Sequence, residues 1–133
     1  MALSKDRNTA MKDGEIISVP VAANAVIYAG ALVVATAAGF AAPGSVATTL
    51  TYLGRAEESC NNAGGVNAAK SVLVRRRSAF YYKNHGADLV TQASIGKVCY
   101  IVDDETVALT NGANTRSAAG IVIGVDAGGV WLQ

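Results

Sequence analysis

The sequence predicts a mainly β protein, either a compact antiparallel β-sandwich or a small barrel, with a polar N-terminal arm and at most one short helix. Fourteen glycines, together with many Asn, Asp and Ser residues, divide the 133-residue chain into short runs. These runs are rich in Val, Ile, Thr and Tyr, the residue types that favour strands. A chain of this length suits one domain with a sizeable core. We therefore assign residues 1–14 to the arm and residues 15–133 to a single β domain.

The turn residues set the limits of the predicted elements. The expected strands are Glu15–Val21, Ile27–Ala35, Gly39–Ala42, Thr49–Glu57, Ser71–Tyr82, Lys97–Val102, Thr106–Thr110, Gly120–Val125 and Gly129–Leu132. Pro20 has no backbone N–H, so the first strand is expected at a sheet edge, or Pro20 at the end of the strand. The segment Ala87–Ser94 is the candidate for a short helical turn.

Successive strands are expected to pair as hairpins. The segments "ALVVATAAGFAAPG", "KVCYIVDDETVALT" and "GIVIGVDAGGVWL" each read as strand, turn and strand. Such neighbours in sequence favour antiparallel pairing, because parallel pairing needs a longer crossover.

Alternation along the last two strands predicts their faces, because successive side chains of a strand point to opposite sides. Ile121, Ile123 and Val125 are expected to share one face of their strand. In the final strand Val130 and Leu132 point one way, and Trp131, the single tryptophan, points the other. Trp131 then either caps an open barrel end or contacts another subunit, where tryptophan is enriched.

The segment "SVLVRRRSAFYYKN", residues 71–84, places charge on both faces if it is one strand. In that case Arg75, Arg77 and Tyr81 share a face, and Arg76 and Phe80 occupy the opposite face. Either a bulge resets the register at the arginines or the strand projects beyond the core. We interpret Arg75, Arg77, Tyr81 and Trp131 as contacts to another subunit or to a partner protein.

Charge and motifs argue against several classes of function. The formal net charge is +1, from 11 basic and 10 acidic residues, which gives no overall attraction to nucleic acid or to an anionic membrane. The polar opening "MALSKDRNTAMKDGE" does not read as a secretory leader. The two cysteines lie far apart and indicate neither a disulfide framework nor a zinc site. We expect no nucleic-acid, membrane or small-molecule partner, and no metal or other cofactor.

Catalytic motifs are weak. "GGVNAAKS", residues 64–71, lacks the second glycine of a phosphate-binding loop and precedes a predicted strand where that motif needs a helix. His85 and Asp88 are close in sequence, so spacing alone leaves a His-Asp pair open, although a turn histidine is the simpler interpretation. We expect that the protein is not an enzyme.

The remaining segments are similar to a known family. "GADLVTQASIGKVCYIVDDETVALTNGANTRSAAGIVIGVDAGGVWL", residues 86–132, resembles the C-terminal half of small tailed-bacteriophage proteins that are encoded near the major head protein. These proteins are regarded as capsid decoration or cement proteins. The opening segment and "IYAGALVVATAAGFAAPG" resemble their N-terminal half. The specific signal is the order "ADxxTxAxIGKxCYxVDDxTVAxT", a degenerate "GTRSAAG" at residues 113–120, and "VDAGGVW".

The resemblance implies a β domain that trimerises on the outer surface of a phage capsid and stabilises the shell. The implied partners are the major capsid protein and further copies of this chain. The implied location is the virion exterior, with the host cytoplasm during assembly. The polar arm is the expected capsid contact, with Leu3, Lys5, Arg7 and Met11 as its binding residues. The alternative is another phage structural role, in a tail tube, in head completion or at a fibre base.

Overall fold

The computed structural model describes residues 2–133 and confirms the mainly β fold. Its strands are β1 Ile16–Pro20, β2 Val26–Ile27, β3 Leu32–Ala35, β4 Ala41–Pro43, β5 Thr51–Ala56, β6 Cys60–Asn61, β7 Ser71–Arg75, β8 Phe80–Asn84, β9 Val98–Ile101, β10 Thr106–Ala108, β11 Ala118–Asp126 and β12 Gly129–Leu132. A 3₁₀ turn, η1 Gln92–Ser94, lies within the segment predicted to be helical. Residues 2–133 contain no helix long and apolar enough to cross a membrane.

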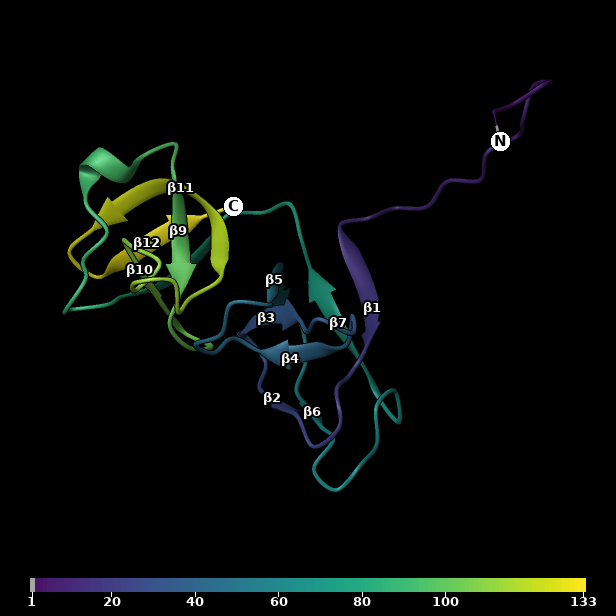
Figure 1. Ribbon diagram of the computed structural model, residues 1–133, viewed down its shortest axis with the longest axis horizontal. Helices are drawn as coiled ribbons and strands as arrows, with labels where there is room; N and C mark the ends of the chain where they lie inside the picture. The colour runs from purple at the N-terminus through teal and green to yellow at the C-terminus, as the bar shows by residue number, and fades with distance from the viewer. Residues whose placement is uncertain (1) are drawn as a thin grey trace.

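The strands form an open sheet beside a barrel (Figure 1). The open sheet has five strands in the order β1-β7-β5-β3-β4, and β2 pairs with β6 in a small separate sheet. The closed barrel has the order β10-β8-β12-β11-β9. All strand pairs in these sheets are antiparallel except β10 with β8, which closes the barrel in parallel.

The predicted hairpins are confirmed, as is the position of Pro20. β3 pairs with β4, β9 with β10 and β11 with β12, each antiparallel. β1 is an edge strand of the open sheet, and Pro20 is its last residue. The missing N–H of Pro20 therefore leaves no gap in an interior ladder.

Two predicted strands are wrong because each is interrupted by a turn. The expected strand Ile27–Ala35 is broken at Tyr28–Ala31, where Gly30 has a φ of +88° and the Ala31 N–H donates to the Tyr28 carbonyl at 3.0 Å. The expected strand Ser71–Tyr82 ends at Arg75 and resumes at Phe80. Arg77 between them has a φ of +62°, which is incompatible with an extended strand.

β3 joins the two hydrophobic cores. Val33 belongs to the core of the open sheet and the β2-β6 pair, whereas Leu32 and Val34 on the opposite face belong to the core of the barrel. Hydrogen bonds add to this connection, since the Leu32 N–H donates to the Asp104 carbonyl at 2.7 Å. The buried Ser117 hydroxyl donates to the Ala47 carbonyl at 2.6 Å and accepts from the Leu50 N–H at 3.0 Å.

Candidate interaction surfaces

The N-terminal arm extends away from the β body (Figure 1). Residues 2–13 are exposed and form no strand or helix. The two apolar side chains proposed as anchors, Leu3 and Met11, are 73% and 98% exposed. Lys5 and Arg7 are exposed as well. Leu3 and Met11 therefore remain available for contact with another molecule.

A second surface lies on the outside of the barrel. Tyr81 on β8, Val98 on β9, and Trp131 on β12 point away from the core, because their neighbours along each strand are buried. Ile121 and Ile123 on β11 are exposed in the same way. We call these five residues the apolar stripe; each is between 39% and 47% exposed.

Strand pairing makes the apolar stripe continuous. Trp131 is the register partner of Tyr81, and their rings lie 4.9 Å apart between centroids, inclined at 49°. Trp131 is also the register partner of Gly124, the residue after Ile123, and Ile121 is the register partner of Val98 on the next strand. A contiguous exposed apolar patch on a sheet face is typical of a site of protein contact.

A bulge in β11 corrects the predicted face of that strand. The register between β11 and β12 shifts between Val122 and Gly124. As a result Ile121 and Ile123 stay outside, whereas Val125 packs against the barrel core and does not share their face. The extra residue of a bulge reverses the alternation beyond it, so strict period-2 counting fails at this point.

Asp126 fixes the end of the stripe nearest to Tyr81. The Tyr81 hydroxyl donates to the Asp126 carboxylate, which also accepts from the N–H groups of Gly128 at 2.8 Å and Gly129 at 3.0 Å. The hydrogen bond from Tyr81 and those from the turn amides hold the pKa of Asp126 below its usual range. The side chain of Tyr81 is therefore held in one position beside Trp131.

The structure separates the predicted group of Arg75, Arg77 and Tyr81. Arg75 is the last residue of β7, and its Nε lies 2.9 Å from Glu57 Oε1. Arg77 lies in the turn that follows, and Tyr81 lies on the outside of the barrel. These residues would share a face only if residues 71–84 formed one strand. They do not, because the chain leaves the open sheet after Arg75 and enters the barrel at Phe80.

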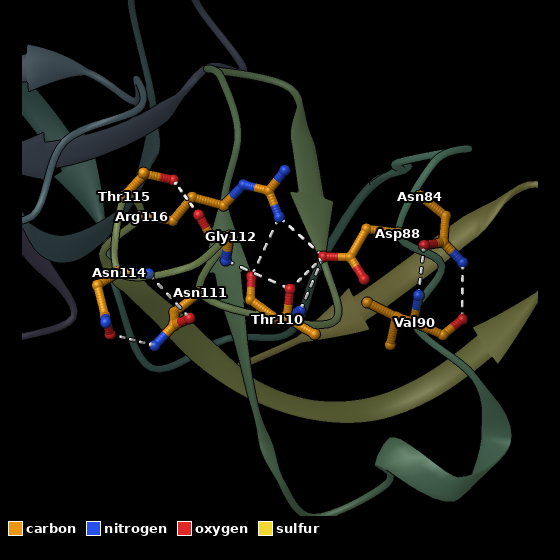
Figure 2. A network of polar contacts seen from close by, with 9 residues as sticks. All are labelled: Asn84, Asp88, Val90, Thr110, Asn111, Gly112, Asn114, Thr115 and Arg116. Atoms are coloured by element: carbon orange, nitrogen blue, oxygen red, sulfur yellow. Dashed lines mark hydrogen bonds and ion pairs between the residues drawn. The ribbon is translucent and has the colours of Figure 1, made fainter.

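Polar side chains join two loops at one end of the barrel, as Figure 2 shows. Asp88 Oδ2 accepts from the Thr110 hydroxyl at 2.6 Å, from the Thr110 N–H at 3.1 Å and from Arg116 Nη1 at 2.8 Å. Asn84 exchanges two hydrogen bonds with the backbone of Val90, at 2.8 and 2.9 Å. Residues 112–114 all have positive φ, and Asn111 closes this left-handed turn by bonding Asn114.

This network joins two of the segments that the sequence analysis singled out. Asp88 belongs to the "ADxxTxAxIGK" segment and Arg116 to the degenerate "GTRSAAG" segment, and the ion pair joins the two. The spacing in the sequence left open a pair between Asp88 and His85, but in the structure the Asp88 carboxylate binds Thr110 and Arg116. The ion pair was missed because 27 residues separate its members, and neither segment shows which residue the other contacts.

Loss of Asp88 is expected to make the protein less stable near neutral pH. Hydrogen bonds from Thr110, together with the Arg116 guanidinium, lower the pKa of Asp88. A carboxylate whose pKa is lower in the folded state stabilises that state above its unfolded pKa of about 4, and this contribution is lost on acidification. The variant Asp88→Asn should therefore melt several degrees below wild type at pH 7. The difference between the two melting temperatures should narrow as the pH falls below about 4.

Thermal melting of both proteins at pH 7, 5 and 3 measures this dependence. The matched control is Asp6→Asn, which removes an exposed carboxylate of the arm and should leave Tm unchanged. A gap between wild type and Asp88→Asn that stays constant over this pH range would show that the charge of Asp88 is not what stabilises the loops.

Comparison of the chain with protein-family models, with curated proteins and with solved structures finds no match. These comparisons therefore show neither a family nor a function for the chain.

Proposed function

We propose that this protein is a decoration, or cement, protein that binds the outer surface of a bacteriophage capsid, as a trimer, and stabilises the shell. The exposed arm is the observation that carries the proposal. A folded body with two cores of its own presents thirteen exposed or half-exposed residues, 2–14, that contribute nothing to those cores. An arm of this kind suits attachment to a neighbouring molecule by main-chain pairing along a strand edge.

The apolar stripe supports self-association in the same proposal. Trp131 and Tyr81 supply the rigid, amphipathic rings that are enriched at protein interfaces. Closed symmetry allows each copy to bury its stripe against a neighbour. Three joined copies then present three arms to a repeating lattice, so moderate contacts at each arm add to tight attachment. No catalytic residue is needed for this role.

The proposal is tested by locating the protein in the particle and measuring its mass in solution. Electron microscopy of particles with and without the protein should show density lost from the outer head surface in its absence. Sedimentation of the purified chain should give three times the monomer mass of 13.5 kDa. Density lost from the tail, the neck or the fibre base would instead support the alternative structural roles. A protein absent from the particle would contradict both.

A further inference from the structure

Four arginines gather where β5, β7 and the connection to β8 meet. The register places Arg55 opposite Arg75 on the neighbouring strands, and Arg76 and Arg77 follow directly. Like charges that face each other across a sheet repel. Glu57 relieves this repulsion, because its carboxylate accepts from both Arg55 and Arg75. The hydrogen bond from Arg55 makes the largest contribution to lowering the pKa of Glu57, and the hydrogen bond from Arg75 makes the next largest.

Arg76 and Arg77 have no such partner. Among residues 2–133, no carboxylate oxygen lies within 4.0 Å of either guanidinium, whereas four other basic side chains are paired in this way. Both charges are therefore free to bind an anion from another molecule. The sequence pointed to Arg75 and Arg77; the structure shows that Arg75 is occupied by Glu57 and that Arg76 is free.

The backbone holds this arginine pair firmly at the root of the arm. The Arg76 N–H donates to the Glu15 carbonyl at 2.7 Å, and Gln133 Nε2 donates to the Arg77 carbonyl at 3.3 Å. The guanidinium of Arg77 lies over Gly14, with its Nη2 3.4 Å from the position of an added methyl group. In Figure 1 the chain that follows β7 runs from near the start of β1 toward the C-terminus.

The backbone of Arg77 is also strained. Its φ of +62° lies in the left-handed region, which is unfavourable for a residue with a side chain. A strained, well-held residue that presents an unpaired charge is the kind of feature that clusters at binding sites. This strain is a second observation, independent of the charge, and it concerns Arg77.

We propose that Arg76 and Arg77 dock an acidic, extended segment of a partner protein at the root of the arm. The planar guanidinium groups match the two oxygens of a carboxylate. Ile16 and Leu73, each 40% exposed, lie on the adjoining strands and provide an apolar contact beside the charges. The bound segment therefore carries carboxylates next to an apolar residue. The identity of the partner as the capsid shell protein rests on the proposed function.

A protein segment fits this surface better than a nucleic acid does. Glu15 is bonded to Arg76 through its backbone, and Glu57 and Glu58 lie along the same strand region, where Glu58 accepts from the Leu73 N–H at 3.2 Å. These carboxylates divide the positive charge into separate sites, whereas a nucleic-acid backbone is bound by a continuous run of unpaired basic side chains. Separate pairs of opposite charge are typical of protein contacts, where they fix the orientation of the partner.

The first test titrates the isolated protein with two probes while its arginine side-chain and backbone NMR signals are followed. One probe is a capped peptide of alternating Glu and Val, and the other is an oligothymidine of similar net charge. The peptide should shift the Arg76 and Arg77 side-chain signals and the Ile16 backbone signal. In the double variant Arg76→Ala, Arg77→Gly the peptide should no longer shift the Ile16 backbone signal, and glycine is chosen at 77 because it adopts a positive φ without strain.

The matched control is Lys70→Gln, which removes an exposed charge just before the opposite end of β7 and should titrate like wild type. If oligothymidine rather than the peptide shifts the two arginine signals, the surface binds nucleic acid and the inference is overturned. If the peptide does not shift the side-chain signals of Arg76 and Arg77, the inference is overturned as well.

The second test separates this inference from the proposed function. Wild type and the double variant are sedimented with phage shells that lack the protein, and the double variant should bind about tenfold more weakly, with a difference that shrinks as salt is raised. Equal binding by the two proteins overturns the inference and leaves the proposed function standing. If neither protein binds, the proposed function fails, whereas the peptide titration still decides the chemistry of the arginine pair.

Discussion

Deletion of Ala2–Asp13 is expected to abolish tight binding to capsids and to leave the β body folded. The deleted residues are exposed and belong to neither core, so their removal should change Tm by no more than about 1 °C. The loss of binding should be large because a trimer loses three attachments at once, which lowers avidity by about a hundredfold or more.

Co-sedimentation with shells and thermal melting of the same preparation measure these two effects. A full-length control in which a Gly/Ser segment of equal length replaces Ala2–Asp13 separates the sequence of the arm from its bulk. A second variant, with Leu3 and Met11 both changed to Ala, tests the two apolar anchors alone and should lose part of the affinity. Undiminished binding by the truncated protein would show that the shell contact lies elsewhere.

Replacement of Trp131 by Ala is expected to weaken association between copies more than it destabilises a single copy. Trp131 is 42% exposed in the single chain, whereas Val130 and Leu132 beside it are fully buried. A buried interface tryptophan typically contributes about 2–4 kcal/mol to association, and each of the three contacts in a trimer would lose it. Within one chain the change removes mainly the ring contact with Tyr81, worth about 1 kcal/mol.

Sedimentation equilibrium and thermal melting on one sample distinguish these effects. The matched control is Tyr28→Ala, which removes an aromatic ring that is 66% exposed and lies outside the apolar stripe. The control should stay associated, whereas Trp131→Ala should dissociate at concentrations where wild type does not. If the Trp131→Ala protein remains a trimer but has a much lower melting temperature, Trp131 contributes mainly to the folding stability of each copy.

The sequence by itself determined the features that depend on neighbours along the chain. The hairpins at residues 31–44, 97–110 and 120–132 were predictable because turn residues separate short runs of strand-forming residues. The outward position of Trp131 followed from period-2 alternation, since no bulge lies between it and its neighbours in β12. The exposed arm followed from its polar composition, which offers little to bury.

Only the tertiary structure decided where alternation and strand continuity fail. The turn between β7 and β8 contains no Gly, Pro or Asn that would mark it in the sequence. Contacts with distant segments hold it instead: the Arg76 N–H donates to the Glu15 carbonyl, and Gln133 Nε2 donates to the Arg77 carbonyl. The bulge that turns Val125 inward is likewise set by pairing with β12. The contacts of Asp88 with Arg116, and of Glu57 with Arg75, join residues 28 and 18 positions apart. Such contacts form only when the barrel and the open sheet close, so local residue preferences carry no signal for them.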